Sequence, residues 1–387
     1  MSSDTVSLIF TGDIGFDKYM ENKWEAEDLL SKPILDFFHS ADHAVINVEG
    51  ALMENAKDDG SRGVLFHSMN PAAISLFEKI GADIWSIGNN HAKDAGIDGI
   101  RSTWAQATKH GVHAMGVGVD LNQASQPVYL PEAGGIGMFC VTYHKTDYPA
   151  TDTTPGIFSW EELDLIQKRI RQIKANCRWC IVVAHGGEEF APLPNPYTRD
   201  LYLKYLDMGA DIVVGHHPHV PQNYELFDNK AIFYSLGNFI FDTGYQRAHP
   251  NTEFGVLLKL KLTQETMTFE ALGTQVLREE GRIEKSSLPE IFTDVPKEEY
   301  ERLMPLSVAA FIVEERKKMI FLQPQRFTEA TEEIWNGYFF SSEPESYRHN
   351  SHNDFFTLIP LGEKAKEGKW KESALEGVKE YILKHFL

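Results

Sequence analysis

Short apolar runs alternate with longer amphipathic segments between residues 6 and 234 of the chain. Short runs that are apolar almost throughout are typical of strands buried on both faces. They occur at Val6–Phe10, Ala44–Val48, Ile84–Ile87, Ile136–Val141, Ile181–Ala184, Ile212–Val214 and Ala231–Tyr234. Because the intervening segments have the length of crossover helices, the pattern predicts an α/β fold.

Two of the intervening segments carry clear helix-start signals. Asn70 and Pro71 form an N-cap and first-turn pair. Ser159 and Glu162 have the spacing of a capping box, and apolar residues recur at helical spacing after them. Both segments are therefore predicted to be helices that connect strands.

One short phrase, Gly-Ala-Asp-Ile, occurs twice, at residues 81–84 and 209–212. Each time it leads from a predicted helix into a predicted strand. The first strand runs into Gly88-Asn89-Asn90-His91 and the second into Gly215-His216-His217. Open α/β sheets bind ligands at the carboxyl ends of their strands, so both loops are expected to face one site.

The pattern changes after residue 255. Apolar residues alternate with others from Val256 to Leu262 and again after Met267, which predicts a hairpin of strands. Past residue 280 the chain becomes charged, with helices expected over 298–321 and 364–386. We place a domain boundary near residue 285, which divides a main domain (residues 1–285) from a mainly helical C-terminal extension (residues 286–387) packed on it.

The C-terminal extension offers two further expectations. The last helix presents an apolar stripe that could dock on the main domain or on a second copy of the chain, as in a homodimer. The polar, histidine-containing stretch at residues 347–354 is expected to be a solvated surface loop.

Composition narrows the classes of partner. The chain has 37 basic and 56 acidic side chains, and the resulting formal charge of -19 disfavours nucleic acid and anionic membranes as partners. No apolar run is long enough for a membrane span, and the start MSSDTVSLIF lacks the features of a signal peptide. We therefore expect a cytoplasmic protein without a membrane anchor. Three cysteines argue against a disulfide framework.

Residues that can bind a metal end six of the apolar runs or directly follow them. A packed core does not need carboxylate, amide and imidazole groups at successive strand ends, whereas a two-metal hydrolytic centre does. The segments are Gly12-Asp13, Asn47-Val48-Glu49, Asn89-Asn90-His91, His185-Gly186-Gly187, His217-Pro218-His219 and Gly237-Asn238.

The carboxylates and amides of these segments suggest individual roles. Asp13 and Glu49 are candidate metal ligands because carboxylate oxygens bind divalent cations well, although a turn or a solvated loop would also explain them. Asn90 could add a weak neutral ligand. His91 could protonate a leaving oxygen as a general acid. A turn residue is the simpler explanation for Asn89.

The histidines carry the most specific signal. Three imidazoles within His216-His217-Pro218-His219 are costly to leave unpaired or charged together, and metal coordination would explain them. In an extended segment residues two apart point the same way, so His217 and His219 can both face the metals, with His216 as the fallback ligand. His185, which ends a buried strand before two glycines, is expected to join them.

The order of these motifs resembles the CapA family of capsule and poly-γ-glutamate biosynthesis proteins, within the calcineurin-like metallophosphoesterase superfamily. The resemblance covers roughly residues 5 to 245 and rests on Gly-Asp, Asn-x-Glu-Gly, Asn-Asn-His, His-x-Gly-x-Glu, Gly-His-His-Pro-His-Val and Ser-Leu-Gly-Asn-Phe. It implies a four-layer α/β/β/α sandwich with a dinuclear site. The implied metal ligands are Asp13, as the bridging ligand, with Glu49, Asn90, His185, His217 and His219. His91 is the implied acid.

The chain departs from the family pattern at several positions. The usual Asp-x-His start reads Asp13-Ile14-Gly15, so one histidine ligand is missing. His91 is followed by Ala92 in place of an acidic partner, and Asp94 is the nearest replacement. Gly186 stands where the family usually has Trp, and the stretch Phe66-His67-Ser68 resembles a family segment that more often carries Arg.

The remaining site expectations concern substrate. Arg62 is the nearby substitute for a phosphate clamp at the position of His67. Glu189, which fits the family pattern, is expected to bind substrate, as are Asn89 and Asn238. Asn238 could alternatively orient a metal ligand.

The resemblance implies a phosphoesterase with two divalent cations, for which oxygen and imidazole donors without thiolate suit Mn, Fe or Zn. Two other functions stay open: a non-catalytic binding or assembly component of poly-γ-glutamate synthesis, and a metal-dependent amide hydrolase. The charge of -19 disfavours loose binding of an anionic polymer, and no anchor is expected. An enzyme acting on an anionic small molecule or polymer is therefore favoured.

Overall fold

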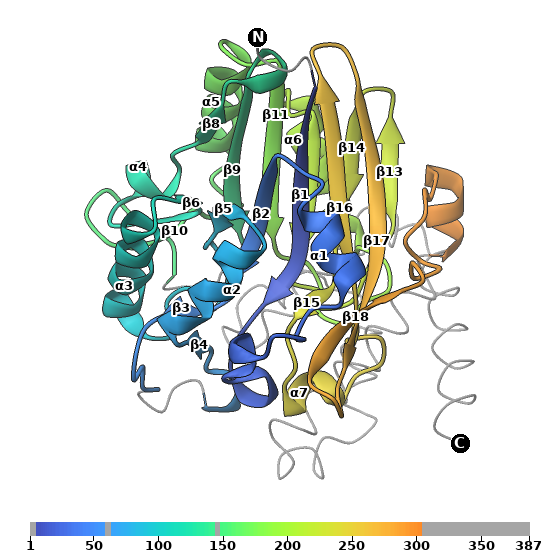
Figure 1. Cartoon of the computed structure of the whole chain (residues 1–387). Coiled ribbons are helices and arrows are strands. Elements are labelled where there is room, and N and C mark those ends of the chain that lie inside the picture. Colours follow the sequence, from blue (N-terminus) through green and yellow to red (C-terminus); the bar gives the residue numbers. More distant parts are fainter. Residues whose placement is uncertain (1–4, 59–62, 144–147, 304–387) are drawn as a thin grey trace, which may run out of the picture.

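Two β-sheets lie face to face at the centre of the molecule (Figure 1). The computed structural model describes residues 5–58, 63–143 and 148–303. The eight-stranded sheet contains, in order, β18 (Arg282–Ser286), β17 (Met267–Leu277), β16 (Phe254–Thr263), β1 (Thr5–Ile14), β2 (His43–Val48), β5 (Ala82–Ser86) and β6 (His113–Met115), with β15 (Asn238–Ile240) also beside β1. The six-stranded sheet contains β13 (Tyr224–Phe227), β14 (Lys230–Phe233), β12 (Ile212–His216), β11 (Trp179–His185), β9 (Ile136–Thr142) and β8 (Val128–Leu130).

Helices cover the outer face of each sheet. Those against the eight-stranded sheet are α1 (Lys32–Phe38), α2 (Ile74–Lys79) and α3 (Gly96–Lys109), and those against the six-stranded sheet are α5 (Leu163–Lys174) and α6 (Pro196–Asp207). Shorter elements are α4 (Leu121–Ala124), α7 (Gly244–Arg247), the paired strands β3 (Ala51–Leu52) and β4 (Ser68–Met69), and the paired strands β7 (Val117–Gly118) and β10 (Gly156–Ile157). Short 3₁₀ helices span Lys18–Met20, Lys23–Glu25, Gly63–Leu65, Pro71–Ala73 and Glu132–Gly134.

Three buried apolar layers hold this arrangement together, because successive side chains of a strand point to opposite faces. In β9, Met138 and Cys140 join the cluster between the two sheets, while Phe139 and Val141 pack with α5 and α6. The described part is thus a mixed α/β structure with two main sheets, as predicted. Its layers run helix, sheet, sheet, helix.

The repeated Gly-Ala-Asp-Ile phrase serves the same purpose in each sheet. Gly81 and Gly209 have positive φ angles of 70° and 114° at the ends of α2 and α6, a conformation that glycine adopts without strain. The Asp83 carboxylate accepts a hydrogen bond from the Ala44 amide at 3.0 Å, and the Asp211 carboxylate accepts one from the Cys180 amide at 2.8 Å. Each aspartate therefore ties the start of its strand to the neighbouring strand.

The structure also corrects local predictions. The proposed capping box is wrong, because α5 begins at Leu163 and the Ser159 hydroxyl accepts from the Glu161 amide at 3.1 Å. Asn70 caps as predicted, since its side chain accepts from the Ala72 amide. All seven predicted strands and the hairpin are present.

The C-terminal predictions are only partly open to inspection. The boundary predicted near residue 285 falls inside β18, which pairs with β17, and a helix begins at residue 297. Most of the helix predicted over 298–321, the loop at 347–354 and the last helix lie outside the described residues. Among the described residues, no helix combines the length and the apolar character that a membrane crossing requires.

Candidate metal centre

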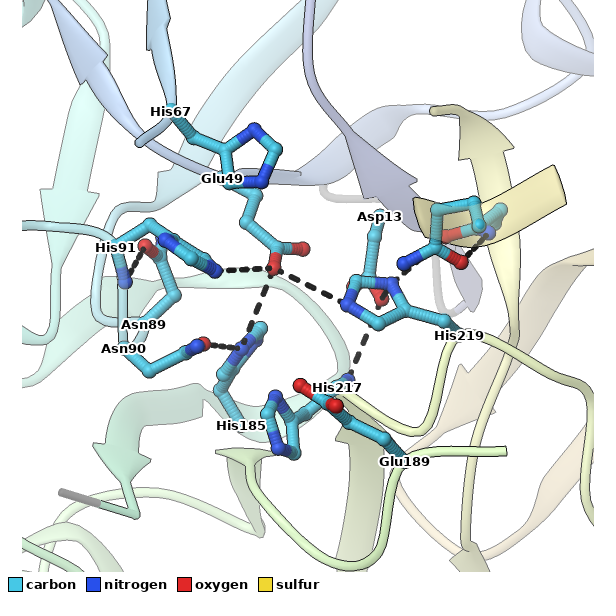
Figure 2. Close-up of polar contacts among 12 residues, drawn as sticks. Asp13, Glu49, His67, Asn89, Asn90, His91, His185, Glu189, His217 and His219 are labelled. Carbon is cyan, nitrogen blue, oxygen red and sulfur yellow. Dashed lines mark hydrogen bonds and ion pairs between the residues drawn. The ribbon is translucent and has the colours of Figure 1, made fainter. Parts of the chain in front are cut away.

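Polar side chains from the ends of strands in both sheets meet in one cluster (Figure 2). The parallel neighbours β1 and β2 place their carboxyl ends at the same edge of one sheet, and β11 and β12 do so in the other. The cluster brings together the six predicted metal ligands, of which all but the half-buried Asn90 are buried: Asp13, Glu49, Asn90, His185, His217 and His219.

Glu49 lies at the centre of the cluster. Its Oε1 is 3.6 Å from Nε2 of His219, 3.9 Å from Nε2 of His185 and 4.0 Å from Nε2 of His91. These separations are too long for hydrogen bonds. They match donors that share a cation, since two ligands each about 2.1 Å from one ion lie roughly 3 to 4 Å apart.

Asp13 occupies the edge shared by the two sheets. Its Oδ1 accepts a hydrogen bond from Nδ2 of Asn47 at 2.8 Å, and its Oδ2 lies 3.2 Å from Nδ1 of His219. Donor atoms of Asp13, Glu49 and His219 all lie within 4.8 Å of one another, as do those of Glu189, His217 and His219. Two groups of three donors therefore share His219.

Asn238 determines which nitrogen of His219 carries the ring proton. The Asn238 amide nitrogen donates to Gln246 Oε1 at 3.2 Å and to the Thr252 carbonyl at 2.9 Å, so its oxygen points to Nδ1 of His219, at 2.9 Å. A proton on Nδ1 then leaves the lone pair of Nε2 on the side of Glu49. This contact matches the orienting alternative that the sequence left open for Asn238.

His185 and Asn90 form another pair of close donors. Nε2 of His185 lies 2.8 Å from Oδ1 of Asn90. Burial, and then the neighbouring His217, lower the pKa of His185 well below its ordinary value. The ring is therefore neutral at physiological pH, which is the form that binds metals.

Charge in the cluster favours a cation. Burial and the carboxylate of Asp13 raise the pKa of Glu49 well above its ordinary value. Burial opposes protonation of His219, but the carboxylates of Glu49 and Asp13 raise its pKa to about 9. Positive charge is thus stabilised between these carboxylates.

Two buried oxygens that lack a hydrogen-bond donor within the described part of the chain are further evidence that these residues fit a metal. Glu49 Oε1 and Asn47 Oδ1 accept no hydrogen bond from any described residue. Buried carboxylate oxygens without a donor are costly unless they are paired or coordinate a metal. With imidazoles around them and no cysteine in the cluster, the donors fit a divalent cation of the Mn, Fe or Zn type.

His91 lies beside the cluster with its own carboxylate partner. Its Nδ1 is 2.7 Å from Oδ2 of Asp94, and the Tyr148 hydroxyl donates to the other Asp94 oxygen at 3.2 Å. The nearest acidic residue in the sequence is therefore the partner of His91. Burial lowers the pKa of His91 despite the opposing charge of Asp94.

The histidine loop after β12 differs from its prediction in conformation. His217 and His219 have positive φ angles of 97° and 58°, so the loop is not extended and the argument from strand alternation was wrong. Both rings nevertheless face the cluster (Figure 2). Nε2 of His216 contacts the Thr11 carbonyl at 2.8 Å. Strained backbone at non-glycine residues is common at functional sites.

The predicted substrate residues lie in different surroundings. The Asn89 amide is occupied by backbone: its nitrogen donates to the Val48 carbonyl at 2.7 Å and its oxygen accepts from the His91 amide at 3.1 Å. These contacts fix the loop that carries Asn90 and His91. Arg62 lies outside the described residues.

A side chain at Gly186 would meet the Trp160 ring at 2.4 Å, so this tryptophan fills the space beside the loop.

Sequence reasoning missed several neighbours of the cluster. Asn47 was part of a quoted motif, and its position opposite Asp13 in the paired strands could have singled it out. The His67 ring packs 4.4 Å from that of His91 and bonds Asp17 at 2.8 Å. Tyr245 donates to Glu189 at 2.9 Å. For Asp17 and Tyr245 no motif in the sequence gave a signal.

Comparison with known proteins adds a family match. Residues 7–243 match the family described as "Bacterial capsule synthesis protein PGA_cap". The "PGA biosynthesis protein CapA" of Bacillus subtilis (strain 168) is 28% identical over 251 residues, covering 64% of this chain and 66% of that protein. The "Capsule biosynthesis protein CapA" of Bacillus anthracis is 27% identical over 257 residues, covering 63% and 62%. The chain thus spans less than two thirds of the length of each relative.

Among solved structures, a putative 5'-nucleotidase from Staphylococcus aureus in complex with alpha-ketoglutarate aligns with a TM-score of 0.40 at 12% identity. The alignment covers 78% of this chain and 58% of that one.

Proposed function

The chain belongs to the PGA_cap family of bacterial capsule synthesis proteins, which is linked to poly-γ-glutamate capsule synthesis, and we propose that it is a divalent-metal-dependent hydrolase of phosphate esters. The observation that carries this proposal is the convergence of three imidazole nitrogens on one buried Glu49 oxygen at 3.6–4.0 Å.

Six side chains would hold the cations. Asp13 and Glu49 supply negative charge, Asn90 supplies an amide oxygen, and His185, His217 and His219 supply imidazole nitrogens. Divalent cations bound there would lower the pKa of water enough for hydroxide to attack an ester at neutral pH.

His91 would handle the proton of the leaving group. Asp94 holds Nδ1 of His91, which leaves Nε2 on the side of Glu49. An anionic substrate next to Nε2 would favour the doubly protonated ring, from which Nε2 could donate to the leaving oxygen. Asp94 and Tyr148 keep the ring in place for this transfer.

A second function draws on the named role of the relatives. They are described as capsule and PGA biosynthesis proteins, so the chain could act on the polymer itself, either by hydrolysing its amide bonds or by binding it during assembly. The formal charge of -19 opposes loose binding of an anionic polymer. We therefore place ester hydrolysis first.

Purified full-length chain with Mn²⁺ and bis(p-nitrophenyl) phosphate tests the proposal. Turnover that disappears with EDTA and in the Asp13→Asn variant supports a phosphoesterase. Shortening of poly-γ-glutamate chains without phosphodiester turnover would instead identify the chain as an amide hydrolase. Cation binding without turnover of either substrate would favour the assembly role.

A further inference from the structure

We propose that Glu189 is a metal ligand, which with His217 and His219 forms a second cation position beside the carboxylates of Asp13 and Glu49. The inference rests on the proposed metal-dependent function of this centre. It gives Glu189 a role different from the substrate binding expected from the sequence.

The donor geometry is the first support. One carboxylate oxygen of Glu189 and one nitrogen each of His217 and His219 lie within 4.8 Å of one another, and all three residues are buried. Two imidazoles and one carboxylate are a common donor set of catalytic metal sites. Nε2 is the nitrogen of His219 that is free to bind, so His219 would serve one position, and Glu49 Oε1 at 3.6 Å from Nε2 would place the other position beside it.

Main-chain contacts hold the Glu189 loop against the histidine loop. The Phe190 amide donates to the Pro218 carbonyl at 2.8 Å, and the Gly186 amide donates to the His216 carbonyl at 3.0 Å. The residue after Glu189 is thus bonded to the residue between His217 and His219. This bond fixes the distance between the carboxylate and the two rings without any contribution from a ligand.

Side-chain contacts then orient the carboxylate. The Tyr245 hydroxyl donates to Oε2 of Glu189 at 2.9 Å. Phe190 has a positive φ of 65° and stacks on the His249 ring at 3.8 Å with the planes 5° apart. A left-handed phenylalanine beside a buried carboxylate is a strained arrangement that the packing must maintain. Tyr245 is therefore a positioning residue for Glu189.

Glu188 provides an internal contrast. It is also buried, but its carboxylate turns the other way and accepts from the Asn195 amide and the Thr198 hydroxyl, each at 3.1 Å. Those contacts lie at the start of α6. Neighbouring glutamates thus have separate tasks, so substitutions at the two positions are matched in residue type and burial.

Cation stoichiometry tests the inference independently of turnover. Full-length wild type, Glu189→Gln and Glu188→Gln would be stripped with chelator, loaded with Mn²⁺, and measured by elemental analysis and titration calorimetry. We expect two ions per chain in wild type and in Glu188→Gln. Glu189→Gln should hold one ion, or bind the second at least tenfold more weakly. Tyr245→Phe should keep both ions and bind the second more weakly.

The outcomes separate this inference from the function on which it rests. Two ions bound by Glu189→Gln with wild-type affinity would overturn the ligand role and leave the proposed function standing. A wild-type chain that binds no Mn²⁺ would overturn both. If Glu189→Gln loses its folded circular dichroism spectrum, Glu189→Asp replaces it. This variant keeps the charge but shortens the side chain, and wild-type affinity for the second ion would then overturn the proposal.

Discussion

The Asn238 side-chain oxygen lies 2.9 Å from Nδ1 of His219 and accepts the proton of that nitrogen, which leaves Nε2 free on the side of Glu49. The amide cannot turn over without losing its bonds to Gln246 and Thr252. Asn238 on β15 therefore sets the tautomer of His219, a proposed metal ligand that follows β12.

Removal of this contact should weaken cation binding. In Asn238→Ala the His219 ring loses the acceptor that selects its tautomer, so Mn²⁺ affinity should fall by about 10- to 100-fold. Titration calorimetry measures the change. Unchanged affinity would show that Asp13, which lies 3.2 Å from the same nitrogen, orients the ring alone.

Substitution of His91 should separate proton transfer from cation binding. His91→Gln should lower kcat by about 10²- to 10⁴-fold while the bound Mn²⁺ per chain stays constant. Asp94→Asn, which changes the partner of Nδ1 and keeps the imidazole, should lower kcat less. Loss of Mn²⁺ from His91→Gln would instead identify His91 as a ligand.

A methyl group at Gly186 should destabilise the fold. Its carbon would lie 2.4 Å from the buried Trp160 ring, and overpacking of this kind costs about 1 to 3 kcal/mol of unfolding free energy. Gly244→Ala is the matched control, since among the described residues beyond its chain neighbours and its own helix no atom lies within 4 Å of a side-chain carbon built there. Denaturant unfolding compares both with wild type, and equal midpoints for all three proteins would contradict the clash.

Chelation should lower thermal stability. A cation that binds only the folded chain adds about 2.7 kcal/mol when its free concentration is one hundred times Kd. The metal-free form keeps Asp13, Glu49 and Glu189 close together, so its melting temperature should fall in EDTA. Asp13→Asn should show a smaller fall in EDTA, because it keeps the donors Glu189, His217 and His219. A wild-type melting temperature insensitive to EDTA would argue against a cation in this cluster.

Stability should also depend on pH through His43. The hydrogen bond and charge of Asp83, 2.6 Å away, raise the pKa of His43 above its ordinary value. A raised folded-state pKa contributes stability that is complete below the unfolded pKa of about 6.5 and is lost as pH rises through the folded value. The unfolding free energy of wild type should therefore decline over this range relative to His43→Gln. Parallel pH curves for the two proteins would refute the pairing.

Much of the fold could be predicted because strands that are buried on both faces are apolar almost throughout and are therefore recognisable in the sequence. The run at 181–184 lies in β11 and the run at 212–214 lies in β12, and both strands continue to a histidine. Boundaries were less accurate where hydrogen bonding, and not apolar pattern, decides them. Ser159 bonds the Glu161 amide and α5 begins later than the capping-box spacing suggested.

The candidate site could be predicted as far as strand ends mark it. Asp13 lies one residue before the end of β1 and His185 ends β11, so each sheet carries one of them to its carboxyl edge. The left-handed backbone at His217 depends on the geometry of its loop. The hydrogen bond from the Tyr245 hydroxyl to Glu189 depends on a segment that is distant in the sequence. No local spacing encodes either contact.

Both sheets contribute to the seven side chains proposed to hold the cations. Asp13, Glu49 and Asn90 come from strands before β9, whereas His185, Glu189, His217 and His219 lie at or after the ends of β11 and β12. Neither sheet alone carries all of these donors, so uptake of both cations would report that the two sheets have folded and docked. Any displacement of one sheet along the other would part the donors, and a bound ion would therefore resist that slippage.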